Sequence, residues 1–360
     1  VKGTKQLLKY AIYHSNLFED LGFKYLGPID GHNLDELTEA LMVAKMMQRP
    51  CLVHIYTKKG KGYAPAEDNS GEYHGLPPKK DDDNNCKGEC FTDAFGKALL
   101  SFADNDNSIY AVTAAMKYGT GLQHFYKAFP ERFFDVGIAE QHAVTFSAGL
   151  ASQGKLPVFA VYSSFLQRSY DQLIHDCAIE KRHVVLGIDR AGFVGEDGET
   201  HHGLFDVAML TTVPGVTVYS PSDTAELLQC LEQALYKDKG VVAVRYPRGC
   251  ELYRSGTKAY SDLRHVSNKS RKLIFTYGRI SAYAYTIHGV DVLQAIKIFP
   301  IADEIINICL AYDEIYAFEE GEREGGIAQK LCTALALAGF KGRFTITAVD
   351  GFVRHADVAT

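Results

Sequence analysis

The sequence predicts an α/β protein in which parallel sheets are flanked by helices. Between Cys90 and Tyr253, continuous apolar runs alternate with stretches of helical periodicity, the pattern of strands that crossover helices cover on both faces. The segment from Lys272 to Thr360 repeats this alternation. The composition, 46% hydrophobic and 23% charged in 360 residues, is that of a globular protein with room for two or three domains.

The elements are expected in three blocks. Residues 1–76 carry a helical stretch at 34–47 and an apolar strand at 51–56 that ends in a Gly/Lys-rich turn. Residues 77–89 are interpreted as a linker because they hold two prolines and an acidic run. In the second block, residues 90–255, we expect strands at 108–112, 133–136, 156–161, 184–188, 216–219 and 240–244, and helices at 139–152, 166–179 and 224–235.

The third block, residues 265–360, is expected to form a second sheet. Its predicted strands are 273–276, 290–295, 314–318 and 344–349, and a helix at 327–338 follows Gly325-Gly326. Only residues 280–288 separate the first two strands, whereas a parallel crossover normally needs a dozen or more residues. Either the crossover helix is very short or residues are missing from the sequence at this point.

Charge and hydropathy argue against two classes of partner. A net charge of -6 gives no electrostatic case for nucleic acid or for an anionic membrane surface. No apolar run approaches the roughly 18 residues of a membrane span. The eight cysteines form no Cys-x-x-Cys pair, so we interpret them as reduced thiols of a cytoplasmic protein.

Polar residues follow several predicted strands, at the edge where doubly wound sheets bind ligands. Glu140 opens a helix that is apolar on nearly every side, so its carboxylate is expected to be partly buried and to need a partner. An ordinary helix-start acid, favoured by the helix dipole, is the alternative. After the strand ending at Val161, Phe165 is either a ligand-facing ring or a core aromatic, and Arg168 could be a surface ion pair.

Two further clusters supply cations. The loop from Asp189 to Gly203 is rich in glycine, as loops that approach a ligand closely often are, although a solvated polar loop is the alternative. It carries Arg190, Asp197, His201 and His202. Arg248 comes directly after a strand, and its forked guanidinium suits phosphate, although a structural ion pair remains open. His32 and His74, taken alone, are interpreted as ordinary loop histidines.

These clusters, in this order, resemble the deoxyxylulose-phosphate synthase family of the transketolase superfamily. The matching strings are Leu26–His32, Lys59–Tyr63, Phe134–Val144, Tyr162–Gln172, Asp189–Gly203 and Arg245–Gly249. The resemblance covers the chain from about Leu17 to its end. It implies a thiamine-diphosphate-binding fold plus a C-terminal transketolase-like α/β domain. Residues 1–76 would then be the end of a diphosphate-binding domain, 90–255 a pyrimidine-binding domain and 265–360 the C-terminal domain.

The resemblance also implies a role for single residues toward the cofactor, thiamine diphosphate. Glu140 matches the glutamate that hydrogen-bonds the pyrimidine ring, a role that would call for a raised pKa. Phe165 matches the aromatic that stacks on the aminopyrimidine, and Tyr63 a tyrosine near the cofactor. His201 and His74 match histidines that shuttle protons.

The same resemblance implies the substrates, pyruvate and glyceraldehyde 3-phosphate. Arg190 and Arg248, with Tyr162, match the family's phosphate-binding positions. Arg168 matches an arginine of the substrate pocket, and Asp197 a residue near the acceptor's hydroxyl. Pyruvate would lose carbon dioxide, and its remaining two-carbon unit would pass to the aldehyde, with the cofactor supplying the electron sink. A homodimer is the expected assembly.

One family feature lies outside the sequence. The superfamily holds Mg2+ and the diphosphate through a Gly-Asp-Gly motif, and no Gly-Asp-Gly occurs in the 360 residues. We therefore expect the metal ligands in a segment upstream of Val1, and the sequence to be part of a longer chain. Transketolase, the β component of a 2-oxo-acid dehydrogenase and a non-catalytic scaffold remain the alternatives.

Overall fold

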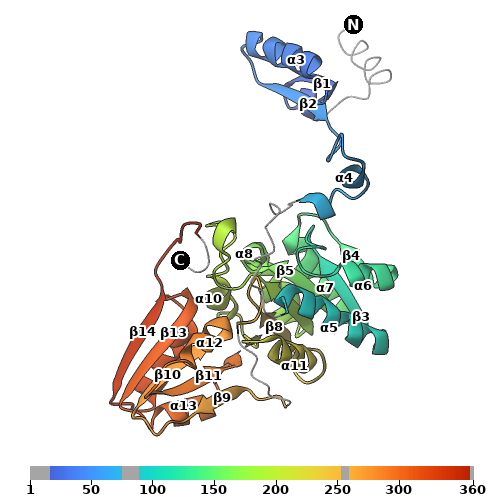
Figure 1. Ribbon diagram of the computed structural model, residues 1–360. Coiled ribbons are helices and arrows are strands. Elements are labelled where there is room, and N and C mark those ends of the chain that lie inside the picture. Colours follow the sequence, from blue (N-terminus) through green and yellow to red (C-terminus); the bar gives the residue numbers. More distant parts are fainter. Residues whose placement is uncertain (1–16, 75–88, 253–258, 357–360) are drawn as a thin grey trace. The chain divides into compact units, whose positions relative to one another are not determined.

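The chain divides into two compact units, Val1–Asp82 and Asp83–Thr360 (Figure 1). The computed structural model describes residues 17–74, 89–252 and 259–356. Apart from Glu89, the predicted linker at 77–89 lies outside these residues. No helix of the described part is both long and apolar enough to span a membrane. The α/β fold predicted from the sequence is confirmed, since each sheet is mostly or wholly parallel and helices flank the sheets.

The first unit is built on two parallel strands and one helix. β1 and β2 pair with Lys24 opposite Cys51, and the Asn33 side chain caps α3 by accepting from Glu36 N at 3.3 Å. The sequence predicted α3 and β2 but not β1. The described elements of this unit are α2 (Leu17–Asp20), β1 (Lys24–Asp30), α3 (Leu34–Met46), β2 (Cys51–Tyr56) and α4 (Ala64–Asp68).

A seven-stranded sheet forms the centre of the second unit, in the order β12-β7-β8-β6-β5-β3-β4. All neighbours are parallel except β12 and β7. The strands are β3 (Ile109–Thr113), β4 (Phe133–Asp135), β5 (Leu156–Tyr162), β6 (Val184–Asp189), β7 (Thr217–Tyr219), β8 (Val241–Arg245) and β12 (Lys297–Phe299). Each strand from β3 to β8 lies within a residue or two of its predicted position, because strands buried on both faces are recognisable as continuous apolar runs.

Helices cover both faces of this sheet. α5 (Phe91–Asn105) and α11 (Thr224–Tyr236) pack on one face, and α7 (Glu140–Ser152) with the helical segment 163–179 packs on the other. Side chains alternate accordingly: Val158 and Ala160 of β5 join the α5 core, whereas Phe159 and Val161 join the α7 core. The remaining helices are α6 (Gln123–Ala128), α8 (Ser163–Leu166), α9 (Tyr170–Gln172) and α10 (Asp206–Leu210).

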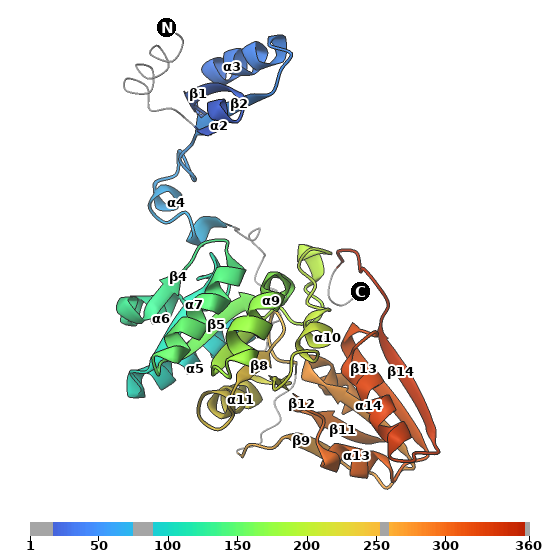
Figure 2. The same cartoon turned by 180° about the vertical axis from the view of Figure 1, so that it is seen from behind.

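The third predicted block forms a five-stranded sheet in the order β14-β13-β10-β11-β9. Its strands are β9 (Leu263–Val266), β10 (Lys272–Tyr277), β11 (Asp291–Ala295), β13 (Glu314–Glu322) and β14 (Arg343–Val349). α13 (Asp303–Cys309) and α14 (Ile327–Leu337) cover one face (Figure 2). β10 and β11 are parallel neighbours joined through the single-turn helix α12 (Ser281–Ala284).

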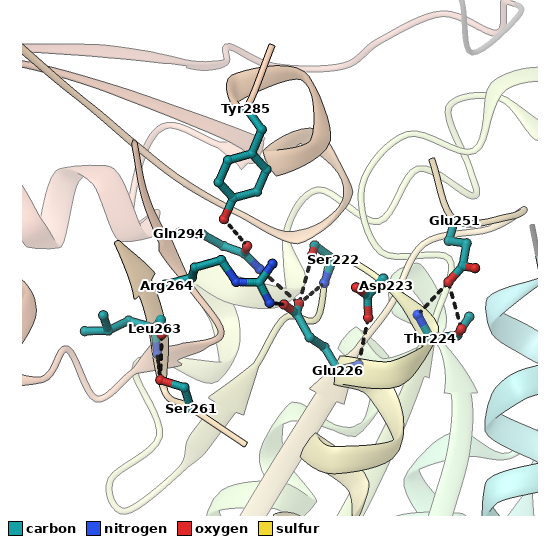
Figure 3. A network of polar contacts seen from close by, with 10 residues as sticks. All are labelled: Ser222, Asp223, Thr224, Glu226, Glu251, Ser261, Leu263, Arg264, Tyr285 and Gln294. Carbon is teal, nitrogen blue, oxygen red and sulfur yellow. Dashed lines mark hydrogen bonds and ion pairs between the residues drawn. The ribbon is translucent and has the colours of Figure 1, made fainter. Parts of the chain in front are cut away.

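The two sheets of the second unit are tied together around a buried carboxylate (Figure 3). Glu226, near the start of α11, receives 2.8 Å contacts from Ser222 N and Oγ and from Arg264 Nη2, and one of 2.9 Å from Gln294 Nε2. Arg264 belongs to β9 and Gln294 to β11, so this carboxylate joins the five-stranded sheet to a helix of the seven-stranded one. Burial raises the pKa of Glu226.

The expectation that all cysteines are reduced is wrong at Cys250, which is disulfide-bonded. Cys51, Cys177, Cys230, Cys309 and Cys332 are free thiols. The backbones of Cys90 and Cys250 form an isolated antiparallel β-bridge, and the two sulfur atoms lie 2.9 Å apart. Chain segments distant in the sequence thus bring sulfur atoms together, which the spacing of the cysteines could not reveal.

Candidate active site

The order of the strands brings the predicted site residues of the second unit to one edge. β8, β6 and β5 are adjacent and parallel, with Tyr162 opposite Asp189 and Ile188 opposite Arg245. The segments that follow these strands therefore emerge side by side at the carboxyl edge of the sheet. Glu140 opens the helix that follows β4, a strand on the same sheet.

Glu140 is the first residue of α7 and is only 2% exposed. Burying a carboxylate in a helix packed against β5 requires a cationic or hydrogen-bonding partner. Arg168 Nη1 lies 2.9 Å from Glu140 Oε2, an ion pair that meets this need in part. The same oxygen makes no hydrogen bond to the described protein, so a buried acceptor is left for another group.

The segment that carries Phe165 and Arg168 is not the single helix predicted at 166–179. It begins as α8, tightens into a 3-10 turn at 167–169, continues as α9 and ends as a π-helix at 173–179. Changes of helical type of this kind are frequent at functional sites because they re-aim side chains. Here Arg168 lies in the 3-10 turn, and its side chain reaches Glu140.

Three rings form a cluster above β5 and β6. Phe165 stacks on Tyr162 with ring centroids 5.5 Å apart, and His201 meets Phe165 edge-on at 5.2 Å. Thr200 Oγ1 lies 2.9 Å from His201 Nδ1 and holds the imidazole in place. Burial raises the pKa of Tyr162, and the nearby Arg190 partly opposes that rise. At neutral pH Tyr162 is therefore a neutral hydroxyl able to donate a hydrogen bond.

Arg190 lies across the Tyr162 ring, with its guanidinium carbon 3.7 Å from the ring centroid. Its Nη1 donates to Gly119 O at 2.8 Å and pairs with Asp189 Oδ1 at 3.1 Å, while its Nε is buried with no hydrogen-bond partner in the described protein. The residue has a φ of 62°, an uncommon backbone conformation for an arginine. A cation in this setting presents a donor that an anionic oxygen could use.

Asp189 helps to orient the Arg190 guanidinium. It is fully buried, and burial raises the pKa of its carboxyl to about 6, although Arg190 and Thr92 oppose the rise. Thr92 Oγ1 donates to Asp189 Oδ2 at 2.7 Å, so α5 also fixes the carboxylate that orients Arg190.

Two glycines allow the close approach of these side chains. A Cβ atom at Gly119 would collide with Tyr162 Oη, and one at Gly203 would collide with Arg190 O. Gly203 lies in a string that resembles the family, whereas nothing in the sequence singles out Gly119. No local pattern around Gly119 could have revealed its role, since the space it leaves is filled by a residue of another strand.

Arg248 is paired with Asp197, and its Nη1 also donates to Val194 O at 3.4 Å. Its side chain is 43% exposed, so the guanidinium remains open to a ligand from solvent. Asp197 and Val194 both belong to the loop 189–203, and Arg248 therefore binds the loop that carries Arg190 and His201. The structure thus connects the predicted cations through one loop.

His202, which was given no role, has a structural one. It is buried, its Nδ1 accepts from Val194 N at 3.1 Å, and Phe193 packs edge-on against its ring. Tyr63 and His74 belong to the first unit, where Tyr63 contacts Tyr73 and the His74 ring contacts Lys59 Nζ. Their part in a site with Glu140 stays a prediction.

The residues present fit the aminopyrimidine half of thiamine diphosphate. The ring needs an acidic partner for a ring nitrogen and an aromatic face, and the carboxyl edge supplies the buried carboxylate of Glu140 and the ring of Phe165. No cluster of three or more His, Cys, Asp or Glu able to hold a metal ion occurs among the described residues.

Comparison with known families gives two matches. Residues 90–251 match a profile described as the transketolase pyrimidine binding domain, and residues 1–57 match one described as 1-deoxy-D-xylulose-5-phosphate synthase. Solved structures share the fold. A split-gene transketolase, described as an inactive β4 tetramer, has a TM-score of 0.64 at 24% identity over 74% of this chain and 90% of its own. A Campylobacter jejuni transketolase has a TM-score of 0.61 at 15% identity over 96% of this chain and 66% of its own.

Relatives named 1-deoxy-D-xylulose-5-phosphate synthase are much closer in sequence. The Aquifex aeolicus protein is 50% identical over 99% of this chain, and the Clostridium kluyveri protein is 48% identical over 78% of it. The chain spans 59% of the length of the first and 46% of the second. With one profile on each side of residues 58–89 and with this identity to its relatives, the chain belongs to the 1-deoxy-D-xylulose-5-phosphate synthase family.

Proposed function

We propose that the protein carrying this chain is a thiamine-diphosphate-dependent transferase that joins pyruvate to D-glyceraldehyde 3-phosphate. The products are 1-deoxy-D-xylulose 5-phosphate and carbon dioxide. The relatives that carry this enzyme's name support the proposal, and so does the arrangement of Glu140, Arg190 and Arg248 at one sheet edge. When bound, the cofactor supplies a thiazolium ring able to accept the electron pair that remains when carbon dioxide departs.

The observation that carries the proposal is the buried carboxylate of Glu140, whose Oε2 is ion-paired with Arg168 at 2.9 Å but accepts no hydrogen bond of good geometry. The ion pair therefore leaves hydrogen-bonding capacity on a buried carboxylate, which a ligand can use. A protonated nitrogen of the aminopyrimidine is a suitable donor.

The acceptor's phosphate is assigned to Arg190 and Arg248. Arg190 offers a buried Nε with no partner, and Arg248 offers a half-exposed guanidinium whose present partner is Asp197. Two guanidinium groups suit a phosphate dianion because each can donate two parallel hydrogen bonds. Tyr162, a neutral phenol between them and Phe165, adds a donor.

His201 is assigned to proton transfer at the developing hydroxyl of the acceptor. Its ring packs against Phe165, and Thr200 holds Nδ1, which leaves Nε2 as the nitrogen that can exchange a proton. Asp197 would bind the acceptor's hydroxyl once the phosphate takes its place on Arg248. Mg2+, a homodimer and a cytoplasmic location complete the proposal.

The test compares Glu140→Gln with wild type in the full-length protein. We expect Glu140→Gln to lower the rate of 1-deoxy-D-xylulose 5-phosphate formation on the order of 10²- to 10⁴-fold, the range for loss of an acid–base group. Glu232→Gln, at an exposed glutamate of α11, is the matched control and should keep wild-type activity.

The donor decides between this enzyme and a transketolase. Release of carbon dioxide from pyruvate only when glyceraldehyde 3-phosphate is present supports the proposal. Transfer from a ketose phosphate, with no use of pyruvate, would instead assign the chain to transketolase chemistry.

A further inference from the structure

Arg279 is a buried cation whose position is unexpected for its residue type. It follows β10 in the five-stranded sheet, within the turn Gly278–Ile280, and only 7% of the residue is exposed. Its formal ion-pair partner is Glu320 of β13, with Nη2 3.1 Å from Oε1. A buried arginine is costly unless its remaining N–H groups also find acceptors.

Those acceptors belong to the two loops that carry the proposed phosphate ligands. Arg279 Nη1 donates to Arg248 O at 3.2 Å, and Nη2 donates to Phe193 O at 3.4 Å. Phe193 lies in the loop 189–203, and its neighbour Val194 accepts from the Arg248 side chain. One guanidinium from the five-stranded sheet therefore joins both loops of the seven-stranded sheet.

Glu320 strengthens the same connection. A Cβ atom at Gly192 would lie 3.0 Å from Glu320 Oε2, so the carboxylate packs directly against the backbone of the loop. Gly192 has a φ of 79°, a conformation in which glycine is favoured. The pair Arg279–Glu320 thus contacts the backbone of the loop that carries Arg190, Asp197 and His201.

We propose that Arg279 is a positioning residue that sets the separation of the Arg190 and Arg248 guanidinium groups, and thereby the preference for a phosphorylated acceptor. This inference rests on the function proposed above. Arg279 does not itself touch the substrate, because its hydrogen-bonding groups are directed to two carbonyls and a carboxylate. A forked guanidinium can hold two carbonyls at a fixed spacing, whereas a lysine ammonium cannot reproduce that geometry.

The main test is Arg279→Lys in the full-length protein, with D-glyceraldehyde 3-phosphate and unphosphorylated D-glyceraldehyde as acceptors. We expect KM for the phosphorylated acceptor to rise on the order of 10-fold, the effect of one lost charged hydrogen bond. The value of kcat, KM for pyruvate and kcat/KM for D-glyceraldehyde should stay near wild type. An equal loss with both acceptors, or no loss with either, would overturn the proposal.

Two further variants separate positioning from folding. Arg279→Met combined with Glu320→Gln removes both charges together, so no buried ion is left unpaired, and should reproduce the KM effect at a wild-type Tm. Arg271→Lys is the matched control, because Arg271 precedes the same strand at its opposite end and pairs with Asp313 on the surface. It should leave both acceptors unchanged, and a KM effect of Arg271→Lys as large as that of Arg279→Lys contradicts the proposal.

A binding measurement keeps this inference distinct from the proposed function. Calorimetry with glycerol 3-phosphate, which cannot react, should show weaker binding by Arg279→Lys than by wild type. If wild type makes no product from glyceraldehyde 3-phosphate, the proposed function is wrong, and this binding difference alone decides the role of Arg279. If wild type and Arg279→Lys bind glycerol 3-phosphate with equal affinity, or if wild type does not bind it, the inference about Arg279 is overturned.

Discussion

Arg190 shows how one residue can be fixed in place before any ligand arrives. Its backbone has a φ of 62°, its carbonyl packs against Gly203, and its guanidinium is held between the Tyr162 ring and Gly119 O. Backbone conformations of this kind persist only where the surroundings determine them, and they concentrate at ligand sites. A preorganised arginine loses little further freedom on binding an anion.

Gly119 gives a direct test of that arrangement. Gly119→Ala places a methyl group where Tyr162 Oη now lies, so we expect Tyr162 and Arg190 to move and stability to fall by about 1–3 kcal/mol. KM for the phosphorylated acceptor should rise in steady-state assays. Gly149→Ala in α7, where a Cβ atom meets nothing within 4 Å, is the control and should be tolerated. Wild-type kinetics for Gly119→Ala would contradict this reading of the site.

Asp189 predicts a pH dependence of stability. Its folded pKa of about 6 lies above the ordinary value of 3.8, so the folded state binds the proton more tightly than the unfolded state. The resulting stabilisation is complete below the ordinary pKa and is lost as pH rises through about 6. Relative to Asp189→Asn, the free energy of unfolding of wild type should fall by roughly 3 kcal/mol between acid and neutral pH.

Urea titrations at a series of pH values measure this difference. Asp104→Asn, at an exposed aspartate of α5, is the control and should parallel wild type throughout. Parallel curves for wild type and Asp189→Asn would show that the Asp189 carboxyl is ionised as readily when folded as when unfolded.

The sequence identified the residues whose chemistry is visible locally and missed those whose role depends on distant neighbours. Glu140 could be expected to be buried because its helix is apolar on most sides, and it is. Arg168 was expected at the surface or in a pocket, and its ion pair with Glu140 was not foreseen. Asp189 lay in a matching string but was given no role, whereas Gly119 and Arg279 gave no local signal because each acts through a residue of another element.

At the scale of helices and strands, the apolar periodicity of the sequence and the burial of each element decide what can be predicted. The parallel strands of the second unit were placed within a residue or two, except that β13 continues four residues beyond its predicted end. The parallel strand β1 was missed, and so were β9 and β12, which are short antiparallel edge strands with few apolar residues. The predicted helix at 166–179 was wrong as a single helix, since tertiary contacts impose a 3-10 turn and a π-helix there. Periodicity does not report such changes.

The start of α11 provides a prediction at this scale. Asp223 caps the helix by accepting from Glu226 N at 2.8 Å, which also orients the carboxylate that joins the two sheets (Figure 3). Asp223→Ala should lower the free energy of unfolding by about 0.5–2 kcal/mol in chemical denaturation. Asp223→Asn keeps a capping oxygen and should lose less. Equal losses for the two variants would mean that the cap contributes nothing.

At the scale of the whole second unit, the two sheets share one core. A single cluster of buried side chains includes Phe159 and Leu186 of the seven-stranded sheet and Phe275 and Leu293 of the five-stranded sheet. Ile298 of β12 lies in that cluster and is fully buried. We therefore expect residues of both sheets to unfold together, as one cooperative transition.

Ile298→Ala tests this expectation. The cavity should cost about 2–5 kcal/mol and shift the transition of the whole second unit without splitting it. Intrinsic fluorescence and far-UV circular dichroism during urea unfolding should report the same midpoint. Ile287→Ala, at a largely exposed position, is the control and should change little. Two separate transitions in Ile298→Ala would show that the sheets are independent.

The pairing of β12 with β7 limits how this protein can be divided or recombined. β12 lies beyond residue 251, where the match to the pyrimidine-binding profile ends, yet it forms the last strand of that domain's sheet. A fragment cut at the profile boundary would leave the edge of β7 that faces away from β8 unpaired and open to a strand from a neighbouring molecule. Chimeras between family members should therefore exchange the segment through Phe299 as one module, or they will aggregate through that open edge.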